Sequence, residues 1–143
     1  MDYSKLAAEL LHEMQRLQAA ALHKLLDESI RGEAFALRYI ACHSGEALPG
    51  DIGVEMNVSS ARIAQTLNSL EKKGLIVRQI DKNDRRRILI SLTPEGEEMA
   101  EKHWSTTSRI AGKMLELLGE KDAQEYVRIT AKLADAVHAC GEF

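Results

Sequence analysis

The sequence predicts a mainly α-helical fold that carries one small β-hairpin. Apolar residues recur at intervals of three and four over most of the chain, which is the period of an amphipathic helix. Only two short runs, 76–81 and 87–93, alternate as strands do, and a charged turn joins them. Aromatic residues make up 4% of the 143 residues, so the core must be aliphatic. The length is that of a single domain.

Residues 5–27 form the first predicted helix, because leucines, a methionine and alanines recur at helical spacing. The apolar stripe is wide and runs for about six turns, and Asp2 or Ser4 can cap its start. A helix of this length has more apolar surface than one small core needs, which favours contact with a second subunit. A long helix within the protein's own core would show the same pattern.

Two shorter helices are expected next. Gly32 interrupts the first pattern, and the helix after it ends near the Ser44–Gly45 pair, where glycine suits a left-handed C-cap. Pro49 suits the first turn of a further helix over about 51–56. Gly53 lowers the propensity of that helix, and we expect close packing against the following helix to account for it.

Residues 59–73 form a helix with two distinct faces. Ser59 can cap its start through the side-chain hydroxyl, and Gly74 ends it. The inward face is apolar and consists of Ile63, Leu67 and Leu70, with Ala64 beside it. The other face has short or hydrogen-bonding side chains and carries no acid in its first turns, which suits a helix set against base edges in a major groove.

The β-hairpin follows this helix. Its turn, Lys82–Arg87, holds three consecutive arginines and Asp84. Thr93 and Pro94 then mark a helix start with acids in the first turn. This helix covers 94–118, and we expect a last helix from about residue 121.

Charge is distributed unevenly along the chain. The net charge is −3, but residues 57–90 hold eight Lys/Arg and three Asp/Glu, a net of +5 between two segments of −4 each. A basic segment in an acidic frame is typical of a surface that faces phosphates. A solvated charged helix and hairpin would be the simpler explanation.

A capped helix, a glycine stop and a hairpin with a basic tip together indicate a winged helix-turn-helix, a unit that reads DNA. The whole chain resembles the MarR family of bacterial transcription regulators. The resemblance rests on three motifs: Leu70–Arg78, Asp84–Arg87 and Leu92–Gly96. The family's wing pattern of Asp, any residue and Arg falls on Asp84 and Arg86.

The resemblance implies a homodimer on a pseudo-palindromic double-stranded DNA operator. Residues 1–143 would form one MarR-type domain. Within it, 1–31 and 119–143 would be dimerisation helices, 46–93 the winged helix-turn-helix and 94–118 a long connecting helix. The protein would be a repressor released by a small aromatic or phenolic effector, with no cofactor, and the cytoplasm is its expected location.

The resemblance also places the DNA-binding elements. The helix from Ser59 to Lys73 would enter the major groove, and Arg86 would enter the minor groove. On that helix Arg62 and Gln65 are the expected base readers, because Arg can read guanine and Gln can read adenine through two hydrogen bonds. Asp84 would stabilise the wing. The predicted DNA-contacting residues are Ser59, Ser60, Ala61, Arg62, Gln65, Ser69, Lys72, Arg85, Arg86 and Arg87. Two departures, Gly53 where family members often carry Ala and few basic residues before Lys72, bear on operator sequence and affinity.

An effector cleft is expected between the dimer helices and the DNA-reading unit. Its predicted lining residues are Arg16, Arg38, Tyr39, His103 and Trp104, each of which would also suit a place in the core.

Other functions find little support in the sequence. No catalytic motif is present, the histidines lack metal-ligand spacing, and no apolar run reaches the ~18–20 residues of a membrane span. The N-terminus lacks the features of a signal peptide. Two alternatives stay open: a thiol-based redox-sensing regulator acting through Cys42, and a winged-helix protein-interaction adaptor that no longer reads DNA.

Overall fold

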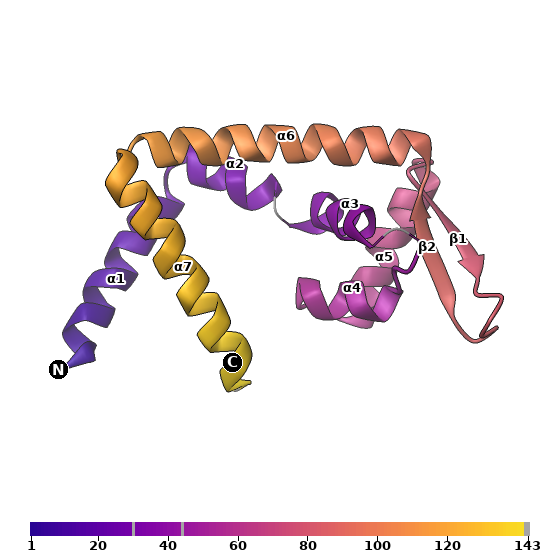
Figure 1. Cartoon of the computed structure of the whole chain (residues 1–143), viewed down its shortest axis with the longest axis horizontal. Coiled ribbons are helices and arrows are strands. Elements are labelled where there is room, and N and C mark those ends of the chain that lie inside the picture. Colours follow the sequence, from indigo (N-terminus) through magenta and orange to yellow (C-terminus); the bar gives the residue numbers. More distant parts are fainter. Residues whose placement is uncertain (30, 44, 142–143) are drawn as a thin grey trace. The chain divides into compact units, whose positions relative to one another are not determined.

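The computed structural model describes residues 1–29, 31–43 and 45–141. The elements in chain order are α1 (Tyr3–Gln18), α2 (Ala21–Ser29), α3 (Gly32–Cys42), α4 (Pro49–Met56), α5 (Ser60–Lys72), β1 (Ile76–Ile80), β2 (Ile88–Leu92), α6 (Pro94–Glu116) and α7 (Glu120–Cys140). The predicted mainly α fold with a small β-wing is confirmed (Figure 1). The chain divides into two compact units, residues 1–108 and 109–143.

The N-terminal region contains two helices, so the prediction of one helix over 5–27 is wrong. Ala19 is the C-cap of α1, and the N–H of Ala20 donates to the carbonyl of Leu17 at 3.0 Å, which tightens the last turn. Figure 1 shows the change of direction between α1 and α2. Alanine is the best helix former, so local propensity does not explain this break.

Helix α3 also ends earlier than predicted, at Cys42, with His43 as its C-cap. Of the predicted end at Ser44–Gly45, Ser44 lies outside the described residues, and Gly45 has the expected left-handed backbone, with a φ of +73°. Pro49 opens α4 as expected, and Asn57 ends that helix in the left-handed region, at φ +51°. Asparagine tolerates this conformation better than most residues.

The core of the unit 1–108 joins α3, α4, α5, the hairpin and the start of α6. Its fully buried large side chains are Leu37, Ile40, Ile52, Leu67, Leu70, Ile76 and Ile90. Ile63 is also buried, whereas Ala64, expected beside the inward face of α5, is exposed. An aliphatic core of this kind holds α3, α4, α5 and the hairpin in one body.

The hairpin is antiparallel, with Ile76 opposite Leu92 and Ile80 opposite Ile88. A short segment before α4 pairs with it, since the N–H of Ile90 donates to the carbonyl of Ala47 at 2.9 Å. The sequence patterns did not predict this contact. It attaches the hairpin to the α3–α4 connection.

Thr93 and Gly96 join the start of α6 to the end of α5. The Thr93 hydroxyl accepts from the N–H of Gly96 at 3.0 Å and donates to the carbonyl of Gly74 at 2.6 Å, so the predicted cap is confirmed. A Cβ added at Gly96 would lie 1.9 Å from the carbonyl oxygen of Leu75. The glycine therefore permits a close approach of two backbones.

In the unit 109–143, α7 begins after Gly119 and has Gly141 as its C-cap, and both glycines have positive φ. One set of its large apolar side chains is exposed: Tyr126, Val127, Ile129, Leu133 and Val137. No helix in the described ranges is long and apolar enough to cross a membrane.

Candidate nucleic-acid interface

Helix α5 presents a polar face opposite a buried one. Ser59 precedes it in an extended conformation, and its hydroxyl accepts from the N–H of Arg62 at 3.2 Å, as the predicted cap requires. Ile63, Leu67 and Leu70 are buried, which turns the opposite side of the helix outward. The predicted DNA-contacting residues of α5 that are exposed are Ser60, Ala61, Arg62, Gln65 and Lys72.

Ser69 has a different environment from the other predicted contacts. Its hydroxyl donates to one carboxylate oxygen of Glu33 at 2.5 Å, and it is half-buried. The Lys73 ammonium donates to the other oxygen of Glu33 at 2.6 Å. Burial raises the pKa of Glu33, but the bonds from Lys73 and Ser69 outweigh it and hold the pKa below its ordinary value. The sequence motifs did not point to Glu33.

Arg78 of β1 holds the same helix from the side of the hairpin. Its guanidinium donates to the side-chain oxygen of Asn68 at 2.7 Å and lies 3.5 Å from the Glu71 carboxylate. Arg78 is only 29% exposed. The last turns of α5 are thus bonded to two neighbours, α3 and the wing.

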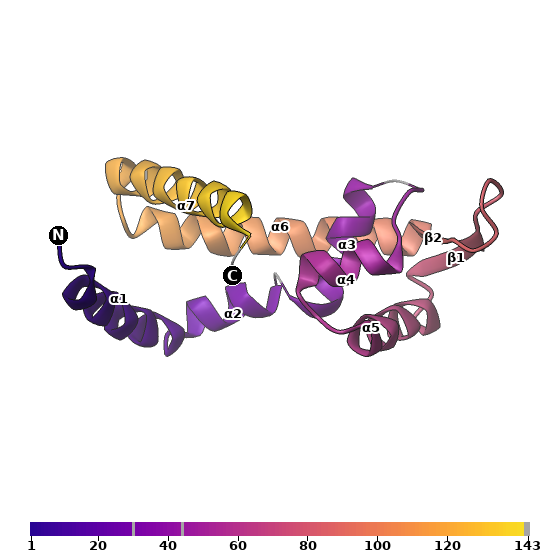
Figure 2. The ribbon, with the colours of Figure 1, turned by 90° about the horizontal axis from the view of Figure 1, so that it is seen from below.

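The turn of the wing, residues 81–87, is organised by Asp84. Its carboxylate accepts from the N–H of Arg86 at 3.0 Å and lies 3.7 Å from the Arg86 guanidinium. The carbonyl of Asp84 accepts from the N–H of Arg87 at 3.0 Å. The predicted pairing of Asp84 with Arg86 is present, and the Arg86 side chain remains 95% exposed. Figures 1 and 2 show the hairpin projecting away from the helices.

Asp81 is a second carboxylate in this turn, and sequence reasoning missed its role. It is 9% exposed and accepts from the N–H of Asn83 at 2.9 Å. Its other oxygen lies 3.9 Å from the guanidinium of Arg87. The Arg87 side chain is therefore paired with Asp81. Arg85 is exposed and has no such carboxylate contact among the described residues. The signal was an Asp two residues before an Asn in a turn, where Asp commonly bonds a backbone N–H.

The predicted effector residues do not form one cluster. The Arg38 guanidinium lies 3.9 Å from the centre of the Trp104 ring, which joins α3 to α6. Tyr39 instead stacks on His43, with ring centres 4.0 Å apart. Burial, and then the charges of Asp51 and Glu55, raise the pKa of Tyr39.

The other two predicted effector residues do not line the cavity described below. Arg16 is exposed on α1 and pairs with Glu13 at 2.6 Å. His103 is half-buried on α6.

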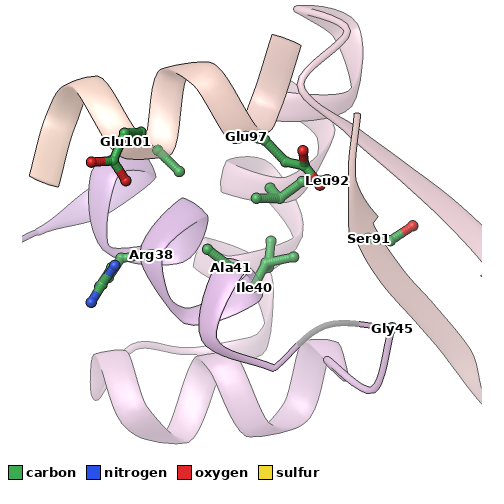
Figure 3. Close-up of a pocket in the computed structure, with 9 residues that line it drawn as sticks. Arg38, Ile40, Ala41, Gly45, Ser91, Leu92, Glu97 and Glu101 are labelled. Carbon is green, nitrogen blue, oxygen red and sulfur yellow. The ribbon is translucent and has the colours of Figure 1, made fainter. Parts of the chain in front are cut away.

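A cavity of about 320 Å³ lies between α3, β2 and α6 (Figure 3). Ile40, Ala41 and Leu92 line it with apolar side chains, and Glu97 and Glu101 line it from α6. Arg38 is the one residue of the predicted effector set that lines it. The volume is at the lower end of the range for small-molecule sites.

The cysteines and the possible metal ligands bear on the redox and metal alternatives. Cys42 and Cys140 are exposed free thiols. Within the part of the chain that the structure describes, no group of three His, Cys, Asp or Glu side chains is placed to hold a metal ion. The Cys42 hypothesis stays a prediction.

A model of the MarR family matches residues 30–87, which hold α3 to the wing turn. The uncharacterized HTH-type transcriptional regulator YwhA of Bacillus subtilis (strain 168) is 34% identical over 143 residues, covering 94% of this chain and 99% of that protein. The HTH-type transcriptional repressor MdtR of the same organism is 30% identical, covering 85% and 79%.

A solved structure shows the same architecture. The S. aureus MepR–DNA complex superimposes with a TM-score of 0.64 at 25% identity, covering 95% of this chain and 98% of that one. Helix order, wing and sequence similarity agree over nearly the whole length. This chain belongs to the MarR family of winged-helix transcriptional regulators.

Proposed function

We propose that this MarR-type transcriptional regulator represses transcription by binding a pseudo-palindromic operator as a homodimer. The observation that carries the proposal is the exposed, acid-free face of α5 in one body with a wing whose Arg86 side chain is 95% exposed. Two relatives support it: MdtR is named a repressor, and MepR has been solved with DNA.

Direct reading of the operator is assigned to Arg62 and Gln65. Arg can bond guanine and Gln can bond adenine through two hydrogen bonds, and each such pair contributes about 1–3 kcal/mol of discrimination. The two residues lie three apart on the exposed face of α5, so they reach neighbouring base steps. Ser59 and Ser60 are assigned to phosphates near the start of the helix.

The wing is assigned to the minor groove, with Arg86 inserted and Arg85 on the adjacent phosphates. A narrow minor groove has an enhanced negative potential that attracts arginine. Asp84 reduces the positive charge of the wing, but its bond to the Arg86 N–H fixes the turn from which Arg86 extends. Its role is therefore to orient the wing.

The dimer is assigned to residues 1–31 and 119–143, with 46–93 as the reading unit and 94–118 as the connecting helix. On α1 the apolar side chains Leu6, Leu10, Leu11, Met14 and Leu17 are exposed, and α7 has its own exposed apolar set. Contiguous apolar faces made of several large side chains are rarely left exposed to water. A second copy of the chain would cover them.

We propose a small aromatic or phenolic acid as the effector, bound at Arg38 and Trp104. A guanidinium can pair with a carboxylate, and an indole face can stack on a ring. Half-sites on DNA lie about one helical turn apart. A ligand that changes the spacing of the two recognition helices by a few ångströms would therefore release the operator.

Selection of bound duplexes from a random pool tests this function. We expect an enriched inverted repeat with half-site centres about one turn apart, and loss of enrichment when a panel of hydroxybenzoates is added. Enrichment of an asymmetric single site would contradict the dimer, and no enriched sequence would contradict DNA reading. Trp104→Leu is the matched variant, because it should keep the repeat and lose the ligand response.

A further inference from the structure

We infer that Glu33 is a positioning residue for DNA reading, because it bonds the first turn of α3 to the last turns of α5 and so sets the orientation in which α5 presents Arg62 and Gln65. The inference rests on the proposed function. It concerns a residue outside the groove-facing surface.

Both oxygens of the Glu33 carboxylate are used by α5. The Ser69 hydroxyl donates to one at 2.5 Å and the Lys73 ammonium to the other at 2.6 Å. These partners lie 36 and 40 residues further along the chain, so the bridge is tertiary. An acid in a first helical turn is favoured by the helix dipole alone, but that role requires no bond to α5.

Directional bonds matter here because the rest of the α3–α5 contact is aliphatic. Leu37, Ile40, Ile63 and Leu67 are buried. The hydrophobic effect itself is non-directional, so side-chain shape is all that these contacts offer against a small rotation of α5. A rotation of α5 by about 10° would move its side-chain surface by about 1 Å. Binding geometry must be held to about 0.5 Å for full effect.

Glu33 acts together with Arg78, which bonds Asn68 at 2.7 Å from the wing side. One bridge holds α5 against α3 and the other holds it against β1. Removal of Glu33 leaves only the second bridge and frees Lys73 and Ser69. The freed Lys73 adds attraction to any duplex, because phosphate attraction is independent of sequence.

The positioning role therefore predicts a change in discrimination. Glu33→Ala should bind a scrambled duplex at least as tightly as the wild type and bind the selected operator less tightly. We define the discrimination ratio as the Kd for the scrambled duplex divided by the Kd for the operator. We expect this ratio to fall about tenfold, which is the effect of impairing about one base contact. The ratio should fall less in Glu33→Gln, because the amide oxygen of Gln can still accept a hydrogen bond from Ser69 or Lys73.

The experiment measures Kd for the selected operator and for a scrambled duplex of equal length, by fluorescence anisotropy at fixed salt. Glu98→Gln, an exposed acid on α6, is the control for loss of one negative charge and should leave the ratio unchanged. A ratio in Glu33→Ala equal to that of the wild type overturns the inference. A loss of folded protein alone lowers both affinities equally and does not move the ratio.

Ser69→Ala provides a second route if Glu33→Ala does not fold. It removes one of the two bonds without changing charge, and we expect a fall in the ratio of about threefold. An unchanged ratio in folded Ser69→Ala then overturns the inference. Failure of the proposed function looks different, since the wild type itself would bind both duplexes equally.

Discussion

The carboxylate of Asp84 accepts a hydrogen bond from the backbone N–H of Arg86 at 3.0 Å, while the Arg86 side chain is 95% exposed. One residue thus shapes the turn and the other extends from it. The same two-residue unit accounts for a basic wing tip that retains an acid.

Arg86→Ala is expected to weaken binding to all duplexes. The plot of log affinity against log salt should become less steep by about one unit, because one fewer phosphate counterion is released. Anisotropy titrations between low and moderate salt measure this slope. Lys102→Ala, on the exposed surface of α6, is the control and should keep the wild-type slope. A wild-type slope in Arg86→Ala would remove the wing assignment.

Asp84→Ala distinguishes two effects of Asp84 on DNA binding, its negative charge and its orientation of the wing. The two predict opposite changes in operator affinity. Removing an acid near DNA should tighten binding if charge alone matters. We expect weaker operator binding instead, because the N–H of Arg86 loses its acceptor and the turn loosens. Asp84→Asn keeps an acceptor, so its operator affinity should lie between those of the wild type and Asp84→Ala. Tighter binding in Asp84→Ala would contradict an orienting role.

Arg62→Ala should relax the preference at one base pair of each half-site. Removing a bidentate contact costs about 1–3 kcal/mol at that position and leaves other positions selective. Repeating the duplex selection with the variant shows this directly. A uniform loss of affinity across sequences would instead assign Arg62 to a phosphate.

Gly96→Ala should destabilise the fold by about 3 kcal/mol, because its Cβ would overlap the Leu75 carbonyl and force a backbone shift. Gly53→Ala is the matched control. Its Cβ would meet Ile63 at 3.5 Å, an ordinary contact, so close packing does not require the glycine and we expect a gain of about 0.5 kcal/mol. Urea unfolding gives both values. A Gly96→Ala midpoint equal to that of the wild type would show that the start of α6 can shift without cost.

The stability that Glu33 contributes should depend on pH. Burial raises its pKa, but Lys73 and Ser69 lower it further, so the folded value lies below the ordinary 4.5. A depressed folded pKa means that the contribution is complete above about pH 4.5 and is lost as the pH falls through the folded value. The urea midpoint of the wild type should therefore exceed that of Glu33→Gln at pH 7, and the difference should shrink as the pH falls below the ordinary value of 4.5. A constant difference would contradict the ion pair.

Features that depend on neighbours within one or two helical turns could be predicted from the sequence. The spacing of Ile63, Leu67 and Leu70 predicts the buried face of α5, and Ser59 and Thr93 are caps whose partners lie three residues away. The wing followed from two alternating runs and the turn at Asp84. Local rules suffice here because each bond closes within a few residues.

Contacts between segments far apart in the chain could not be predicted from the sequence and became visible in the folded structure. The bond from Ser69 to Glu33, the approach of Gly96 to Leu75 and the pairing of Ala47 with Ile90 join residues whose separation carries no periodic signal. The break after Gln18 falls among alanines that favour a helix. These features depend on how packed helices meet, and packing angles arise from the combined shape of many side chains.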